Sequence, residues 1–349
     1  MKPASFVLAA TVSLLGTGAL AQAPNIVTEE MMVPASEAGI EIYVRNKRPA
    51  AMSAFRPERT VVFVHGATNP ASTGFDLVLG GLSWMEYIAA RGYDVYLLDL
   101  RGYGRSTRPK EMEEDPKANP PIVRGETAVK DIGSVVDFVL TRRKIPRVSL
   151  FGHSWGTTLM ASYAAQHPGK VERLVLYAPQ WIRTTPSPVQ APAGSGALGA
   201  YRLVTVEQTW ARRMTGVPEH KKADLFPAGW FETWAEATWA SDPKAADRVP
   251  PAMRAPNGVV QDGQEYWSVG KPYYDPGKVT SPTLLVLGEW DNDTPPHMAQ
   301  TLFPLLTNSP GKRLVILGEG THVNYMERTR MKLFEAVQSF LDEASPSMN

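Results

Sequence analysis

The sequence predicts an α/β protein in which a doubly wound, mostly parallel sheet carries a helical cap insertion. Short, nearly continuous apolar runs recur along the chain, and most of them end in a glycine turn. Helical patterns lie between these runs, and one long segment breaks the alternation. Strands that are covered on both faces read as continuous apolar runs, and alternating strands and helices are typical of a parallel sheet.

Each expected element follows from its own pattern. Parallel strands are expected at residues 60–66, 93–104, 147–154, 171–179, 283–291 and 312–320. Helices are expected at residues 79–90, 126–143, 157–167, 296–306 and 323–343. Residues 26–33 and 40–45 are expected to form an antiparallel hairpin that precedes the parallel strands.

The segment at residues 181–278 contains no clean strand pattern. It opens with a stretch rich in proline, alanine, glycine and serine and continues with several tryptophan-bearing segments. We expect it to form a mainly helical cap over the carboxyl edge of the sheet. The core of the fold then comprises residues 24–180 and 279–345.

The first 23 residues have the pattern of a secretory signal peptide. Lys2 precedes a mostly apolar run at residues 6–15, and the small residues Ala21 and Ala23 follow. We expect cleavage near Ala23 and export to the periplasm or the extracellular space. A disordered or membrane-anchoring terminus is the alternative, although the apolar run is shorter than a bilayer span requires.

Composition excludes several classes of function. The chain contains no cysteine, which excludes disulfides, thiolate catalysis and cysteine-ligated metals. Apart from Lys2, basic and acidic residues balance at 35 each, so no nucleic-acid partner is expected. No later apolar run is long enough to predict an integral membrane segment.

The stretch Gly152-His153-Ser154-Trp155-Gly156 predicts a nucleophile. It follows an apolar strand and precedes a helix, which is the context of a nucleophile elbow. The two glycines permit a tight turn that lifts the Ser154 hydroxyl above the sheet. The Trp155 N–H then points toward a substrate oxyanion at a helix N-terminus. The alternative is that Ser154 only caps the helix.

A serine nucleophile needs a base, and the base needs an orienting carboxylate. His322 follows the last expected strand, after Ser154 in the chain, where it could reach the elbow. The turn after the strand at 283–291 offers Asp291 as the carboxylate, with Asp293 or Glu289 as alternatives. The expected catalytic set is therefore Ser154, Asp291 and His322.

The order of these three residues is that of one particular fold. From Glu41 to Leu341 the chain resembles the α/β-hydrolase fold family, through "VHGAT", "LDLRGYGRS", "GHSWGT", "GEWDNDTPP" and "GTH". The resemblance of "VHGAT" to the family's oxyanion loop implies that the Ala67 N–H is a second oxyanion donor beside Trp155. The segments "GHSWGT" and "RGYGRSTRP" are similar to those of proline iminopeptidases, which usually have glycine in place of His153.

These observations predict a secreted or periplasmic serine hydrolase that cleaves a carboxylic ester or lactone through a Ser154 acyl-enzyme. The expected partner is a small-molecule ester, and no metal or organic cofactor is implied. Trp210, Trp230 and Trp234 are interpreted either as a substrate-binding slot or as the core of the insertion. Asp99 and Arg101 are expected to brace the turn that follows their strand.

Three other functions remain open from the sequence. An aminopeptidase of the proline iminopeptidase type needs a carboxylate in the insertion that binds the substrate amine. The sequence offers Glu207, Glu232, Glu236 and Asp262 for this. A perhydrolase would use the same three catalytic residues, and a non-catalytic ligand-binding protein could share the fold.

Overall fold

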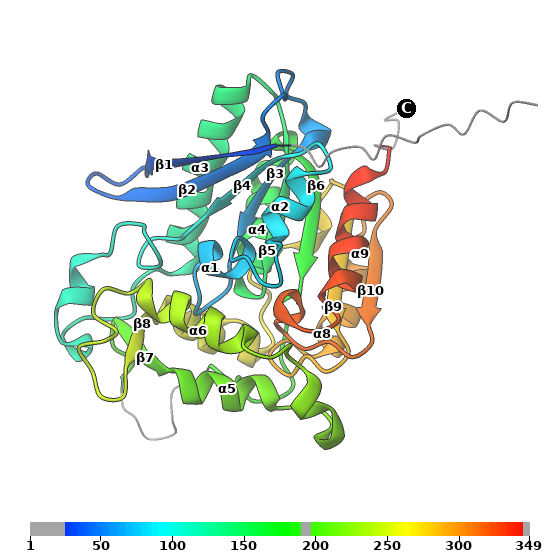
Figure 1. The fold of residues 1–349 in the computed structure, drawn as a ribbon. Coiled ribbons are helices and arrows are strands. Elements are labelled where there is room, and N and C mark those ends of the chain that lie inside the picture. The colour runs from blue at the N-terminus through cyan, green and yellow to red at the C-terminus, as the bar shows by residue number, and fades with distance from the viewer. Residues whose placement is uncertain (1–24, 190–196, 345–349) are drawn as a thin grey trace, which may run out of the picture.

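The computed structural model describes residues 25–189 and 197–344 (Figure 1). The signal peptide predicted for residues 1–23 lies outside the described residues.

The described chain is built on an eight-stranded sheet in the order β1-β2-β4-β3-β5-β6-β9-β10. The strands are β1 Ile26–Pro34, β2 Glu41–Pro49, β3 Thr60–Val64, β4 Asp94–Leu98, β5 Val148–His153, β6 Val171–Tyr177, β9 Thr283–Gly288 and β10 Arg313–Leu317. β2 pairs antiparallel with β1 and β4, and the remaining neighbours pair in parallel. The predicted fold class, including the antiparallel hairpin, is confirmed.

Helices cover both faces of the sheet (Figure 1). One face carries α3 Gly125–Arg143, α4 Trp155–Gln166 and α8 Pro296–Leu302, and the other carries α1 Ala71–Phe75, α2 Trp84–Ala89 and α9 Arg330–Asp342. Alternate residues of β3 pack into the two layers: Val62 and Val64 on the first face, Val61 and Phe63 on the second. This two-sided burial explains the uninterrupted apolar runs in the sequence.

Three of the expected helices are shorter than their patterns suggested. The helix expected at 296–306 ends as α8 at Leu302 and is followed by a 3₁₀ turn at Phe303–Leu305. The helix expected at 79–90 begins only at Trp84, because the Ser83 side chain caps it and Glu86 completes a capping box. The helix expected at 323–343 is split into a 3₁₀ turn at Asn324–Met326 and α9. In all three cases residues with helical periodicity lie in an ordered turn instead.

The cap contains strands as well as helices, although its sequence shows no clean strand pattern and predicts a mainly helical cap. Its helices are α5 Val206–Met214, α6 Trp230–Ala240 and α7 Gly258–Glu265, and β7 Tyr201–Thr205 pairs antiparallel with β8 Ala252–Pro256. β8 holds two alanines and a proline, which have low strand propensity. Tertiary contacts compensate, because buried Asp242 accepts a 2.8 Å hydrogen bond from the Arg254 N–H and pairs with its guanidinium.

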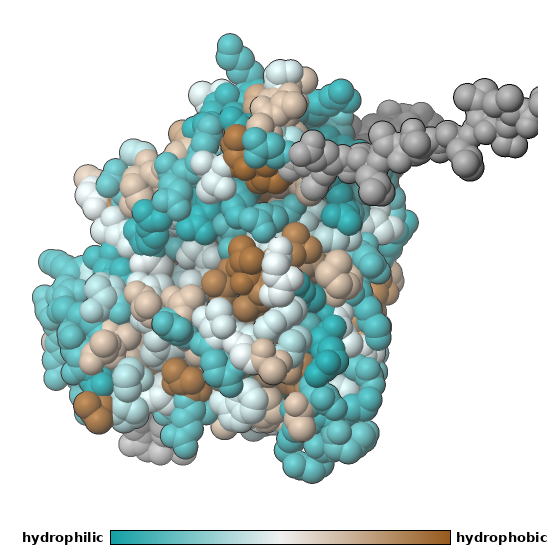
Figure 2. All heavy atoms as spheres, in the orientation of Figure 1, coloured by the Kyte–Doolittle hydropathy of each residue, from teal (hydrophilic) through white to brown (hydrophobic). Residues whose placement is uncertain are grey.

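In Figure 1, α5, α6, β7 and β8 lie together on one side of the sheet, at the carboxyl ends of its parallel strands. Hydrophilic residues dominate the face of the molecule drawn in Figure 2, and its hydrophobic residues form small separate groups. Within residues 25–189 and 197–344, none of the helices combines the length and apolarity that crossing a membrane requires.

Candidate functional site

Ser154 occupies a strained turn between β5 and α4. Its backbone has φ 56° and ψ −122°, a conformation that a residue with a side chain adopts at a cost of about 1–3 kcal/mol. A Cβ on Gly152 would lie 2.3 Å from the Gly156 carbonyl oxygen, and one on Gly156 would lie 2.5 Å from the His65 carbonyl oxygen. The two glycines are therefore required by the close approach of backbone on both sides of Ser154.

Asp291 and His322 form a buried pair. The two Asp291 carboxylate oxygens lie 3.0 and 2.9 Å from His322 Nδ1. Asp291 Oδ1 also accepts hydrogen bonds from the N–H groups of Asp293 and Thr294, and the Thr294 hydroxyl donates to Oδ2. These donors fix the carboxylate so that it holds the Nδ1–H tautomer of the imidazole and leaves Nε2 for proton transfer.

Of the three acidic residues in this turn, the structure places Asp291 at His322 Nδ1. Glu289 is exposed, and Asp293 turns toward the cap. His322 and Ser154 line the same cavity, but no hydrogen bond joins the Ser154 hydroxyl to His322 in the described part of the chain. Such a bond is often long in a ligand-free active site and shortens when substrate binds.

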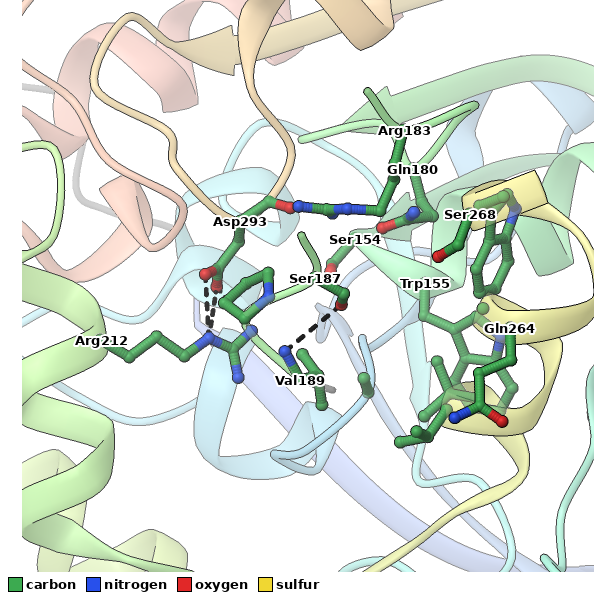
Figure 3. Close-up of a pocket in the computed structure, with 16 residues that line it drawn as sticks. Ser154, Trp155, Gln180, Arg183, Ser187, Val189, Arg212, Gln264, Ser268 and Asp293 are labelled. Atoms are coloured by element: carbon green, nitrogen blue, oxygen red, sulfur yellow. Dashed lines mark hydrogen bonds and ion pairs between the residues drawn. The ribbon is translucent and has the colours of Figure 1, made fainter. Parts of the chain in front are cut away.

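Ala67 and Trp155 line a second cavity with Ser154 (Figure 3). The Gly66 carbonyl accepts a 2.7 Å hydrogen bond from His65 Nδ1, and the Leu100 N–H donates to His65 Nε2 at 3.0 Å. Burial lowers the pKa of His65 to about 4, so the ring stays neutral with its proton on Nδ1. Because C=O and N–H of a trans peptide point in opposite directions, this bond sets the direction of the Ala67 N–H.

Asp293 connects the site to the cap. Arg212 donates to its carboxylate through Nε and Nη2, and Arg213 donates through Nη1 at 2.8 Å. Its Oδ2 also lies 3.6 Å from His322 Nε2. Burial alone would raise the pKa of Asp293, but the positive charges of Arg212, His322 and Arg213 outweigh burial and hold the pKa well below its ordinary value. Asp293 is therefore an ionised anchor for helix α5.

Cap residues that the sequence did not single out line the cavity at Ser154. Figure 3 shows Arg183, Arg212 and Gln264 around it, and Trp267 also lines it. The adjacent Arg212 and Arg213 at the end of a helix resemble an ordinary solvated helix end, where basic residues are favoured. Only the fold reveals that both face a carboxylate from a different part of the chain.

The structure does not place the three predicted tryptophans at this cavity, which corrects their interpretation as a substrate-binding slot. Trp234 is fully buried in the hydrophobic core beneath the cap, and Trp210 packs against Phe226 and Phe231. Trp230 contacts Gly80 and the Arg330 guanidinium. Large aromatic side chains on α5 and α6 stabilise the packing of these helices, since they bury much apolar area.

Asp99 braces the turn after β4, as predicted, whereas the Arg101 side chain pairs with Asp131 and Glu37, which lie outside that turn. Asp99 accepts hydrogen bonds from Ser72 and from the Arg105 N–H, and Arg101 forms a buried ion pair with Asp131. Among residues 25–189 and 197–344, no cluster of three or more histidine, aspartate and glutamate side chains is arranged to hold a metal ion.

The chain belongs to the α/β-hydrolase fold family, because the family model for this fold matches residues 59–329. It is 30% identical over 116 residues to a proline iminopeptidase of Arabidopsis thaliana, covering 33% of this chain and 25% of that one. It is 34% identical over 112 residues to a human (lyso)-N-acylphosphatidylethanolamine lipase, covering 31% of this chain and 29% of that one. The match therefore spans less than a third of either relative.

Solved structures share the fold over a longer part of the chain. A thermophilic esterase from Thermogutta terrifontis superposes with a TM-score of 0.55 and 15% identity, covering 90% of this chain and 98% of the esterase. At this identity the similarity supports the fold alone.

Proposed function

We propose that the protein is a serine hydrolase that cleaves carboxylic esters through an acyl-enzyme on Ser154. The observation that carries the proposal is the strained Ser154 at a cavity that it shares with His322, whose Nδ1 is held by Asp291. The similarity of one segment to a lipase also supports ester cleavage. The predicted signal peptide at residues 1–23 supports activity after export.

The proposed reaction needs no group beyond these side chains and water. His322 Nε2 takes the Ser154 proton as the hydroxyl oxygen attacks the ester carbonyl, and Asp291 stabilises the imidazolium. The N–H groups of Ala67 and Trp155 hold the oxyanion, and each such donor lowers the barrier by about 3 kcal/mol. His322 then protonates the leaving alcohol, and a water activated by His322 hydrolyses the acyl-enzyme.

An aminopeptidase activity is a weaker proposal, favoured by the similarity to a proline iminopeptidase. Glu207, Glu232 and Glu236 are exposed on the cap, and Asp262 is ion-paired with Arg124. None of these four carboxylates is among the residues that line the cavity at Ser154. A substrate ammonium group would therefore lack a free carboxylate partner there.

The test compares Ser154→Ala with the wild-type chain on a panel of 4-nitrophenyl esters and on proline 4-nitroanilide. Ester turnover should fall at least 10³-fold in the variant, since the nucleophile is lost. Labelling of the wild type by a fluorophosphonate should map to Ser154 by mass spectrometry. The matched control is Ser134→Ala, because the Ser134 hydroxyl donates only to the Lys130 carbonyl on α3. Ester turnover that survives Ser154→Ala would contradict the proposal.

A further inference from the structure

Cationic side chains surround the proposed site. Three cavities adjoin one another here: two lined by Ser154, and one of about 460 Å³ beneath the cap. Arg212 lines all three. The charged Lys and Arg side chains in their linings are Lys117, Arg183, Arg202, Arg212 and Arg213. Asp293 is the one acidic side chain among the residues that line these cavities.

Protein carboxylates compensate only part of this positive charge. Arg212 and Arg213 share Asp293. Arg183 donates to the carbonyl groups of Thr185, Pro186 and Asp293, and it forms no ion pair with a carboxylate in the described chain.

Arg202 has the same kind of environment. Its guanidinium donates to the carbonyl groups of Pro256 and Ala67 and to the Thr68 hydroxyl, and no carboxylate of the described residues pairs with it. Burial lowers the pKa of Arg202 to about 10 and also lowers that of Arg183. A buried charge without a counter-charge destabilises a protein, so an anion in these cavities would be favourable.

Arg212 offers a geometry that suits such an anion. Its Nε and Nη2 form the edge that binds Asp293. Its Nη1 makes no hydrogen bond with any described residue, and Arg212 is a lining residue of all three cavities. The edge formed by Nη1 and the second hydrogen of Nη2 is therefore free, and such an edge fits a carboxylate through two parallel hydrogen bonds.

From this arrangement we infer that the natural substrate is an ester with a free carboxylate remote from the scissile bond, and that Arg212 binds this carboxylate. The cavity at Ser154 and the larger cavity beneath the cap adjoin each other, because both are lined by Pro188, Val189, Arg212 and Val260. The reacting ester group thus lies at Ser154 and the charged end of the substrate lies under the cap. This inference rests on the proposed ester hydrolysis for its catalytic part only.

The main experiment measures kcat/KM for matched anionic and neutral esters at low salt. One pair is mono-4-nitrophenyl adipate and its neutral carboxamide analogue; the other is 3-carboxyphenyl butanoate and 3-carbamoylphenyl butanoate. The two pairs place the charge on the acyl and the alcohol side. Wild type should prefer the anionic member of at least one pair about tenfold or more, because hydrogen bonds between charged groups are the strong ones.

Variants of Arg212 test which group binds the charge. Arg212→Gln should reduce the anionic-to-neutral ratio of kcat/KM about 10–100-fold, and Arg212→Lys should restore part of it. The matched control is Arg59→Gln, which removes an exposed guanidinium paired with Asp342 just before β3. It should leave the ratio unchanged. Equal turnover of both members of each pair by wild type, or a ratio that Arg212→Gln does not lower, would overturn the inference.

A binding measurement separates this inference from the proposed function. Calorimetric titration of Ser154→Ala with adipate, and with adipamide as the neutral control, does not depend on turnover. One outcome is that wild type cleaves no ester, while adipate binds and Arg212→Gln abolishes this binding. That outcome would support the anion site and contradict ester hydrolysis. Ser154-dependent ester cleavage without any preference for the charged members, together with equal binding of adipate and adipamide, would support ester hydrolysis and contradict the anion site.

Discussion

The carbonyl oxygen of His322 accepts hydrogen bonds from two side chains of the nucleophile region. His153 Nε2 donates to it at 2.9 Å, and the Tyr177 hydroxyl donates at 3.0 Å. The two rings stack with their centroids 4.7 Å apart. Burial and the charge of His322 lower the pKa of His153 well below its ordinary value, so this ring stays neutral. The residue that precedes Ser154 thus connects the elbow to the loop that carries the proposed base.

Tyr177→Phe tests this connection with the smallest change. It removes one donor to the His322 carbonyl and keeps the stacked ring. We expect kcat on an ester substrate to fall several-fold with KM little changed, and the free energy of unfolding to fall by about 1 kcal/mol. Steady-state kinetics and urea denaturation measure the two effects.

The control for this substitution is Tyr163→Phe on α4. The Tyr163 hydroxyl is buried and has no hydrogen-bond partner among the described residues. Its removal should leave both kcat and stability nearly unchanged or raise stability slightly. If Tyr177→Phe behaves like this control, the hydroxyl does not position His322.

The sequence singled out Ser154 and His322, and it offered Asp291 as the carboxylate with Asp293 and Glu289 left open as alternatives; the structure places Asp291 at His322 Nδ1. The motif and the position after the last strand single out the serine and the histidine. Glu289, Asp291 and Asp293 share one short turn, and their roles depend on which side chain the N–H groups of that turn hold. The roles of Arg183 and Arg212 were missed because their partners come from remote parts of the chain.

At the scale of single elements, the elbow leaves no space for a side chain at Gly152. The 2.3 Å contact that a Cβ would make is with the Gly156 carbonyl, a backbone atom of α4 that cannot move alone. Gly152→Ala should therefore lower the free energy of unfolding by about 2–3 kcal/mol or more, and it should reduce labelling of Ser154 by a fluorophosphonate. Differential scanning calorimetry and mass spectrometry measure these effects.

Gly169→Ala is the matched control for the elbow substitution. A Cβ at Gly169 would meet no atom within 4 Å, and this residue lies in a 3₁₀ turn after α4. We expect no loss of stability and no change in labelling. Equal stability of the two variants would show that the elbow tolerates a side chain and that its glycines are not required by packing.

Helices and strands could be predicted where the hydrophobic pattern was long and its residues are buried. They were harder to predict where a helix cap or strand pairing determines the ends or the existence of the element. The central strands and α3 lie where periodicity placed them, because burial on both faces produces a strong pattern. α2 starts later than its periodicity because a capping box at Ser83 competes with helix propagation. β8 was not predicted because its residues have a weak strand propensity. Its antiparallel pairing with β7 and the hydrogen bond from the Arg254 N–H to Asp242 stabilise the strand in spite of this.

At the scale of the whole molecule, the fold could be predicted because several motifs occur in one order along the chain. The charge of the cavities could not be predicted, because the charged side chains that line them come from the loop after β9, from α5 and from the segment after β6. Folding also determines which ionisable groups become buried. Two of these, His65 and Glu327, affect how the stability of the whole molecule depends on pH.

The two groups act in opposite directions. Burial lowers the pKa of His65 to about 4 from 6.5, so stability is lost as pH falls from about 6.5 toward 4 and the folded state resists protonation. Burial raises the pKa of Glu327 to about 7 from 4.5, although hydrogen bonds from Thr321 and Asn324 oppose this shift. The folded state thus favours protonated Glu327, and stability is lost as pH rises from about 4.5 through about 7.

Glu327→Gln should remove the second dependence. The carboxamide keeps the shape of the protonated acid and its bonds to the Thr321 N–H and hydroxyl. We expect the variant and wild type to be similarly stable near pH 4.5, and the variant to be more stable by on the order of 2–3 kcal/mol at pH 8. Because both proteins contain His65, its contribution cancels in their difference.

Urea denaturation across pH 4.5–8 measures this difference, with exposed Glu207→Gln as the control for loss of a surface charge. A difference that does not change with pH, or a wild type that is the more stable protein at pH 8, would show that Glu327 is ionised in the folded state at no cost, and that its bonds to Thr321 and Asn324 outweigh its burial.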